Sequence, residues 1–215
     1  MMELFSQPEL LDRYLIDKSS PEDPILAELS RHTYLKEVHP RMLSGPVMGR
    51  FLQMFSQLIA PDRILEIGTF TGYSAICLAR GLKPGGHLTT IEMNDELRNT
   101  TLHYFKKAGV SKQITLINGD ALDVIPPLTD TFDLVFIDAN KVDYPKYYDL
   151  VIDKVAGGGY LLADNVLWGG KVLDNSTSDQ TTDTIREFNR IITKDQRVEN
   201  LLLPIRDGVM LIRKL

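Results

Sequence analysis

The most informative segment of the chain is residues 64–74, which read Ile64-Leu65-Glu66-Ile67-Gly68-Thr69-Phe70-Thr71-Gly72-Tyr73-Ser74. The segment runs from an apolar strand pattern through two glycines into a helical pattern. Gly68 has no Cβ, so the backbone can turn tightly there and approach a ligand closely. The glycine spacing is G-x-x-x-G and not the G-x-G-x-x-G of a dinucleotide pyrophosphate site. The segment therefore predicts a strand–turn–helix unit that binds a ligand with less phosphate to hold.

Downstream of this unit, short apolar runs alternate with helical patterns at about residues 72–82, 95–108 and 145–155. The expected strands are Arg63–Ile67, His87–Ile91, Gln113–Ile117, Phe132–Ile137 and Tyr160–Ala163. Alternating strands and helices imply right-handed crossovers and a mostly parallel sheet covered on both faces. The tail, residues 197–213, predicts an antiparallel pair with Asp207-Gly208 in its turn, closing one edge of the sheet.

Upstream of the unit, residues 1–60 have a helical character. Apolar side chains recur at helical spacing over residues 22–37 and 46–59, separated by a turn-rich connector at residues 39–46. We expect these apolar stripes to serve as core or subunit contact. The whole pattern predicts one α/β domain over residues 1–215, with residues 1–60 as a helical extension and residues 61–215 as the core.

Composition narrows the class of protein further. The chain has 215 residues, of which 43% are hydrophobic and 25% charged, which excludes wholesale disorder. The net charge is −5, so the chain lacks the excess of basic residues that is usual in nucleic-acid-binding proteins. The single cysteine, Cys77, excludes an intramolecular disulfide and a thiolate metal cluster. We see no signal-peptide pattern and no apolar run of bilayer length, so we expect a cytoplasmic protein without membrane contact.

Three successive strand ends favour a nucleoside-bearing cofactor. Gly68 follows the first strand, and Glu92 ends the second at about the distance expected for a ribose-hydroxyl acceptor. The third strand leads into the turn at residues 118–121. Ligands of open α/β sheets bind at this carboxyl edge, so the three strand ends together predict a cofactor site.

The next two strands end in polar side chains. Asp138 follows a buried strand, with Lys141 close behind it, and Asp164 and Asn165 follow the next strand. Neighbouring parallel strands lie about 4.8 Å apart, so these groups can converge. Two carboxylates and an amide oxygen suit Mg²⁺, Mn²⁺ or Ca²⁺ and leave positions for water and substrate. Either aspartate alone could instead be a helix cap, but the set favours a metal site.

Other candidate residues are weaker. The histidines, His39 included, show no metal-ligand spacing such as H-E-x-x-H. Tyr144, Tyr147 and Tyr148 follow Lys141 and could line a pocket, although core packing is the stronger expectation for them.

The chain resembles the cation-dependent O-methyltransferases, which use S-adenosyl-L-methionine and include catechol and caffeoyl-CoA O-methyltransferases with many bacterial relatives. The matching stretches are residues 65–74, 91–92, 119–121, 136–141 and 164–168. The combination of Asp138-x-x-Lys141 with Asp164-Asn165 is the specific part. The resemblance implies a Rossmann-like class I methyltransferase sheet, mostly parallel with an antiparallel C-terminal strand, plus N-terminal helices and a homodimer.

The resemblance also implies the cofactor contacts. The methionine part would be held by the glycine turn, the ribose hydroxyls by Glu92 and the adenine by the turn after the third strand. The implied set is Ser44, Glu66, Gly68, Thr69, Tyr73, Ser74, Glu92, Ala121, Asp138 and Asn140.

For the reaction, the resemblance implies that Asp138, Asp164 and Asn165 bind a divalent cation. Mg²⁺ is the first expectation, ahead of Mn²⁺ and Ca²⁺. Asp138 and Lys141 would be the catalytic residues, and Trp168 with Lys141 would meet the acceptor. Lys141 is either a general base or an electrostatic aid, because burial lowers a lysine pKa and neighbouring carboxylates raise it.

The expected function is methyl transfer to a vicinal-dihydroxy, catechol-like small molecule. One alternative keeps the chemistry and changes the acceptor to the wobble 5-hydroxyuridine of tRNA, which some bacterial relatives methylate. A third reading is a binding module that retains the fold and has no turnover. The intact Asp138, Lys141, Asp164 and Asn165 argue against that reading.

Overall fold

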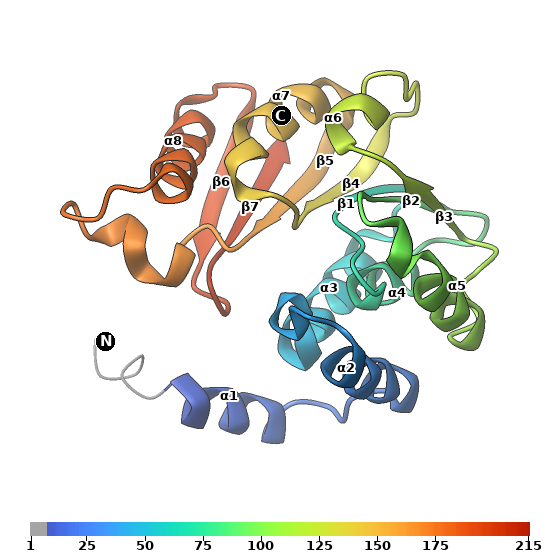
Figure 1. Ribbon diagram of the computed structural model, residues 1–215. Helices are drawn as coiled ribbons and strands as arrows, with labels where there is room; N and C mark the ends of the chain where they lie inside the picture. The colour runs from blue at the N-terminus through green and yellow to red at the C-terminus, as the bar shows by residue number, and fades with distance from the viewer. Residues whose placement is uncertain (1–7) are drawn as a thin grey trace.

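The computed structural model of the protein describes residues 8–215, and its centre is a seven-stranded sheet of order β3-β2-β1-β4-β5-β7-β6 (Figure 1). All pairings from β3 to β5 are parallel, and β7 runs antiparallel to β5 and β6. The strands are β1 Arg63–Ile67, β2 His87–Glu92, β3 Ile114–Asn118, β4 Phe132–Ile137, β5 Val155–Asp164, β6 Val198–Leu203 and β7 Val209–Lys214. The predicted mostly parallel sheet with an antiparallel tail is confirmed.

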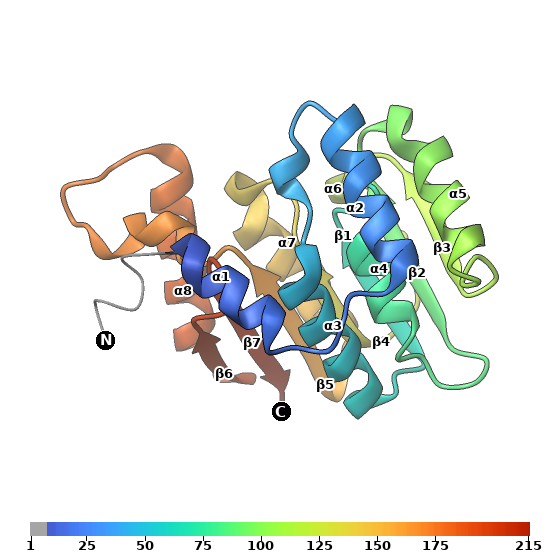
Figure 2. The same cartoon turned by 90° about the horizontal axis from the view of Figure 1, so that it is seen from below.

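Helices cover both faces of the sheet. One face carries α6 Ala121–Val124, α7 Tyr144–Val151 and α8 Gln180–Lys194. The other carries α2 Pro24–Lys36, α3 Gly45–Ile59, α4 Tyr73–Ala79 and α5 Arg98–Lys107, while α1 Pro8–Asp17 lies against α3 (Figure 2). Short 3₁₀ turns complete the connections: η2 Pro40–Met42, η3 Asp95–Leu97, η4 Lys141–Asp143, η5 Ile152–Lys154 and η6 Trp168–Leu173.

The strand order reverses beside β1, which pairs with β2 on one side and β4 on the other. A crevice at such a switch point, outside the carboxyl ends of the strands, is where open α/β sheets bind ligands. The apolar strands are buried on both faces, as in Leu65, Val135 and Leu161 on one side of the sheet and Ile64, Leu134 and Leu162 on the other.

Two features differ from the expectation. The helix expected over residues 145–155 ends at Val151, and β5 starts already at Val155 rather than at Tyr160. A register irregularity between β4 and β5, beside three consecutive glycines, accommodates this early start. The second difference is α8, for which no helix was expected, although Ile185, Phe188 and Ile192 recur at helical spacing and Asp179 caps its first turn.

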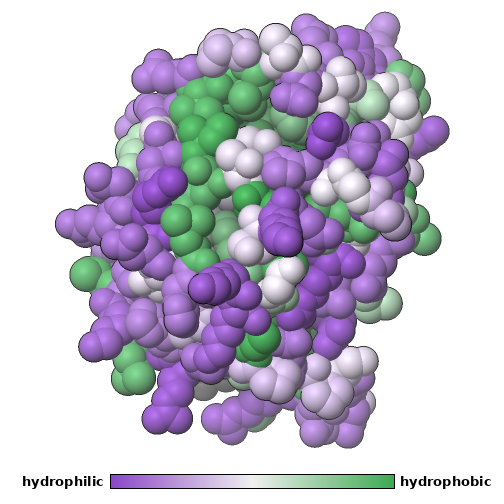
Figure 3. Space-filling model, turned by 90° about the vertical axis from the view of Figure 1, so that its right-hand side faces the viewer, coloured by the Kyte–Doolittle hydropathy of each residue, from purple (hydrophilic) through white to green (hydrophobic). Residues whose placement is uncertain are grey.

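On the face drawn in Figure 3 most of the surface is hydrophilic, and apolar residues gather in a band. Among the helices of residues 8–215, none is both long enough and apolar enough to cross a membrane.

Candidate active site

A cavity of about 820 Å³ opens at the carboxyl ends of β1 to β5, at the switch point of the sheet. Nearly every residue expected at the site lines it. The lining includes Ser44, Gly68, Thr69, Tyr73, Ser74, Glu92, Ala121, Asp138, Asn140, Lys141, Asp164, Asn165 and Trp168. Six separate segments of the chain are thereby brought together at one edge of the sheet.

The glycine turn after β1 is tightly constrained. Gly68 has φ of 97°, and a Cβ at this position would overlap the carbonyl oxygen of Asp138, the residue that follows the neighbouring strand β4. Gly72 has φ of 93° and forms the N-cap of α4. Glycine is therefore required at residue 68 both by its left-handed backbone and by the close approach of β4.

Glu92 is held in place at the end of β2. Its Oε2 accepts a hydrogen bond from the Phe70 amide at 2.7 Å, and its Oε1 accepts one from the Asn94 amide at 2.9 Å. The carboxylate thus bridges the glycine turn and its own strand end. Each oxygen keeps a further lone pair for hydroxyl donors in the cavity.

Glu66 is the exception among the expected cofactor contacts. Its side chain is fully buried and does not line the cavity. Oε2 accepts a hydrogen bond from Thr90, whose hydroxyl also meets that of Thr69, and Oε1 has no partner among the described residues. Burial raises the pKa of Glu66 to about 8. Glu66 therefore does not contact the cavity directly. Hydrogen bonds through Thr90 and Thr69 link it to the cavity wall.

The ends of β4 and β5 bring the expected catalytic groups together. The Nζ of Lys141 donates to Asp138 Oδ1 at 2.8 Å and to the Tyr144 hydroxyl, also at 2.8 Å. The Lys141 and Asp138 side chains are only 13% and 16% exposed. Burial favours a neutral lysine, but the charge of Asp138 and the Tyr144 hydroxyl outweigh it and raise the pKa of Lys141. Lys141 is therefore an ammonium in this arrangement.

Asp164 and Asn165 form the other half of this edge. Asp164 is buried, and its pKa is raised by burial and by the negative charge of nearby Asp138. Its Oδ1 accepts a hydrogen bond from the Asn165 amide at 2.7 Å. Asn165 adopts a left-handed backbone, with φ of 60°, a conformation that asparagine tolerates better than most residues.

The donor set fits a hard divalent cation. Asp138, Asp164 and Asn165 offer two carboxylates and one amide, all lining one cavity, and the charge of Asp138 is close enough to help raise the pKa of Asp164. Within residues 8–215, no three His, Cys, Asp or Glu side chains gather in a group that could hold an ion. An oxygen-ligand site here therefore depends on the amide of Asn165 as its third protein ligand.

Sequence reasoning missed one contributor and undervalued two others. Arg206, in the turn between β6 and β7, lines the cavity and donates to the carbonyls of Leu43 and Ser44. No local pattern signals this contact, because it joins positions far apart in the chain. Tyr147 and His39 also line the cavity, although core packing was the stronger expectation for Tyr147 and His39 shows no metal-ligand spacing.

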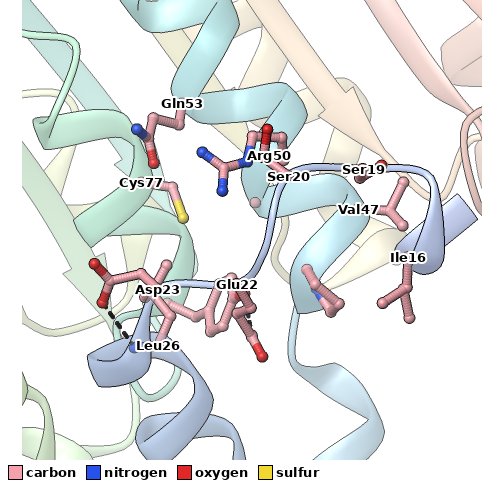
Figure 4. Close-up of a pocket in the computed structure, with 13 residues that line it drawn as sticks. Ile16, Ser19, Ser20, Glu22, Asp23, Leu26, Val47, Arg50, Gln53 and Cys77 are labelled. Carbon is pink, nitrogen blue, oxygen red and sulfur yellow. Dashed lines mark hydrogen bonds between the residues drawn. The ribbon is translucent and has the colours of Figure 1, made fainter.

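A second cavity, of only about 30 Å³, lies between the segment at residues 19–23 and helices α3 and α4 (Figure 4). Asp23 caps α2 there through the Ile25 and Leu26 amides, and Glu22 accepts a hydrogen bond from the Tyr73 hydroxyl at 2.6 Å. The space is about that of one water molecule, so the large cavity is the one that can hold a cofactor and an acceptor.

The fold and the cavity define a class I methyltransferase, and comparison with known proteins gives the family. Residues 16–215 match the sequence profile of the O-methyltransferase family, so the chain belongs to that family. It is an S-adenosylmethionine-dependent O-methyltransferase of the caffeoyl-CoA and catechol type.

Relatives match along nearly the whole chain. The caffeoyl-CoA O-methyltransferase of Stellaria longipes is 31% identical, covering 97% of this chain and 91% of its own. The catechol O-methyltransferase of Niastella koreensis is 33% identical, covering 91% and 90%. Among solved structures, the O-methyltransferase from Bacillus cereus in complex with SAH has a TM-score of 0.89 at 29% identity and covers 100% of both chains. TomG of Streptomyces achromogenes, involved in tomaymycin synthesis and solved with SAM, has a TM-score of 0.88 at 30% identity over 98% and 99%.

Proposed function

We propose that the protein transfers the methyl group of S-adenosylmethionine to one hydroxyl of a vicinal-dihydroxy aromatic small molecule. The transfer needs a divalent cation, and Mg²⁺ is the first candidate. The observation that carries the proposal is the convergence of Asp138, Lys141, Asp164 and Asn165 in the cavity that also holds the glycine turn. The similarity to a caffeoyl-CoA O-methyltransferase and a catechol O-methyltransferase supports a phenolic acceptor.

In this proposal the cofactor lies along the carboxyl ends of β1 to β3. Its methionine part meets Gly68, Thr69, Tyr73 and Ser74, and Ser44 and Asn140 contribute polar contacts. Glu92 accepts from the ribose hydroxyls, and Ala121 gives the adenine a small, apolar neighbour. Their common position on the cavity wall supports these assignments. Glu66 acts on the cofactor side indirectly, through the hydroxyls of Thr90 and Thr69.

Asp138, Asp164 and Asn165 would hold the cation, which as a Lewis acid would lower the pKa of a bound phenol and fix two adjacent oxygens. The methyl group of a sulfonium is already activated, so the residues of the chain mainly align the transfer. Lys141 supplies positive charge beside the reacting oxygen. Its Nζ donates to both neighbours, Asp138 and Tyr144, which supports an electrostatic role over that of a general base.

The acceptor end of the cavity would be bounded by Trp168, Tyr147 and Arg206. The indole and the phenol ring suit the face of a flat aromatic acceptor. Trp168 belongs to η6, which contains the left-handed Gly169 and Gly170, so its position depends on how that loop is held.

The metal assignment is tested by Asp138→Ala. We expect this variant to lose Mg²⁺-dependent turnover and to lose Mg²⁺ binding measured by calorimetry without acceptor. Asp149→Ala, at an exposed position of α7 outside the cavity, is the matched control and should retain both. Undiminished Mg²⁺-dependent activity in Asp138→Ala would overturn the assignment.

The choice of acceptor is tested separately. Turnover with a dihydroxyphenyl acid supports the small-molecule reading. If the protein binds S-adenosylmethionine and leaves dihydroxyphenyl acids unmethylated, the next acceptor to assay is tRNA with a hydroxylated wobble uridine, for which salt-sensitive binding is the signature.

We also propose a homodimer in which the N-terminal helices supply the contact. Large apolar side chains of α1 and α3 stand exposed, among them Leu10, Tyr14, Met54 and Leu58. An amphipathic helix normally buries its apolar face, and a second copy of the chain would cover both helices at once.

A further inference from the structure

Tyr144 lies at the first turn of α7, directly behind the active-site edge of the sheet. Its side chain is fully buried and its ring packs edge-on against Phe188 of α8. It does not line the cavity, so it cannot touch the acceptor or the cofactor. Its hydroxyl nevertheless bonds to groups on both strand ends that do line it.

The Tyr144 hydroxyl joins three parts of the site. It accepts a hydrogen bond from Lys141 Nζ at 2.8 Å and donates its own proton to the main-chain carbonyl of Asp164 at 2.9 Å. The carbonyl of Ile137, at the end of β4, lies 3.3 Å away. One hydroxyl therefore links the lysine that follows β4 to the residue that ends β5.

The loss of this hydroxyl would act on both strand ends. Among the described residues, Lys141 Nζ would keep only Asp138 as a hydrogen-bond partner, in a side chain that is 13% exposed. Asp164 would lose the donor to its carbonyl, just before the left-handed turn at Asn165. A buried polar group without a partner either shifts to form a new hydrogen bond or destabilises the folded state by its desolvation free energy.

We infer that Tyr144 is a positioning residue for methyl transfer, one that sets the place of Lys141 and of the Asp164–Asn165 turn without meeting either substrate. The inference rests on the role proposed above for Lys141 and goes beyond it. Displacement of a reacting group by a fraction of an ångström slows a reaction that depends on alignment. Tyr144 therefore acts on kcat more than on cofactor binding, most of which lies along β1 to β3.

Tyr144→Phe tests this, because it removes the hydroxyl and keeps the packing of the ring. Tyr148→Phe is a closely matched control. Tyr148 is on the same helix, is equally buried, packs on the same Phe188 and also uses its hydroxyl, which donates to Asp195 away from the site. We expect similar losses of thermal stability in both variants. Only Tyr144→Phe should lower kcat, on the order of tenfold, with the Kd for S-adenosylmethionine unchanged.

A double-mutant cycle with Lys141→Met separates positioning from general weakening of the structure. If Tyr144 acts through Lys141, Tyr144→Phe slows the Lys141→Met enzyme by much less than it slows the wild type. A structural defect would slow both backgrounds by the same factor.

The possible outcomes are distinct. A kcat of Tyr144→Phe no lower than that of Tyr148→Phe overturns the inference, as do effects that multiply fully in the double variant. If Lys141→Met alone leaves kcat unchanged, the proposed role of Lys141 fails. The route through Lys141 then fails with it, whatever Tyr144→Phe does.

Discussion

At the scale of single residues, Glu66 is a carboxyl group buried beside hydroxyl groups, and no basic side chain among the described residues pairs with it. It sits in the middle of the sheet with a pKa raised to about 8 by burial, against an ordinary value of 4.5. The folded chain therefore holds a proton on Glu66 over a pH range in which the unfolded chain has released it. Because the native state binds more protons, the free energy of unfolding falls as pH rises through this range.

We predict that the free energy of unfolding of the cofactor-free protein declines between about pH 4.5 and 8, by up to about 1.4 kcal/mol per pH unit from this group alone. Glu66→Gln keeps the shape and cannot ionise, so its decline should be shallower. Urea unfolding at a series of pH values measures both slopes. Equal slopes in the two proteins would show that Glu66 does not carry the proton.

At the scale of elements, the turn between β1 and α4 depends on one glycine. Gly68→Ala combines a left-handed backbone with overlap on the Asp138 carbonyl. Gly85→Ala is the matched control, because Gly85 is also left-handed, with φ of 81°, and a Cβ there would meet no atom within 4 Å. Both variants bear backbone strain of about 1–2 kcal/mol, and only the first also forces β1 and β4 apart.

We expect Gly68→Ala to lose more stability than Gly85→Ala and to bind S-adenosylmethionine at least about tenfold more weakly, a difference of roughly 1.4 kcal/mol. Thermal unfolding and calorimetric titration measure the two effects. Equal behaviour of the two variants would contradict the close approach at Gly68.

The loop that carries Trp168 depends on one arginine of α8. The Arg186 guanidinium donates to the carbonyls of Lys171, Val172, Asp174 and Thr177, which gathers the loop around it. Arg190, one turn further along the helix, bonds only with Glu187 of its own helix among the described residues.

We predict that Arg186→Ala raises the KM for the acceptor, on the order of tenfold, because the loop loses its common donor, while the Kd for S-adenosylmethionine stays the same. Arg190→Ala should change neither. Steady-state kinetics with varied acceptor measures this, and an unchanged acceptor KM in Arg186→Ala would separate the loop from acceptor binding.

At the scale of the whole molecule, the strand ends could be predicted because apolar runs end at polar or glycine residues. Parallel strands bring those ends to one edge of the sheet. Asp138 and Asp164 were predicted for this reason, and the structure lines one cavity with both. The contacts of Arg206 and of the Tyr144 hydroxyl could not be predicted, since they follow from packing between distant segments, whereas the burial of Tyr144 was expected. Helix α8 was not predicted, although Ile185, Phe188 and Ile192 recur in it at helical spacing. Glu66 belongs to the same motif as Gly68, but Gly68 lines the cavity and the Glu66 side chain is buried away from it.

The exposed apolar side chains of α1 and α3 predict that the protein is a dimer in solution. Light scattering at micromolar concentration should give twice the mass of one chain. Leu58→Glu, at the most exposed apolar position of α3 (82% exposed), should give single chains. Leu102→Glu, on α5 at 39% exposure, should not. A wild-type mass of one chain would rule out the dimer.

The function proposed for the protein is cation-dependent methyl transfer at the edge formed by β4 and β5. Its most direct test is transfer of a labelled methyl group from S-adenosylmethionine to a dihydroxyphenyl acid, measured with Mg²⁺, with EDTA, and with EDTA followed by excess Mg²⁺. We predict turnover with Mg²⁺, none with EDTA, and recovery when Mg²⁺ returns. Turnover that continues undiminished in EDTA would contradict the role given to Asp138, Asp164 and Asn165.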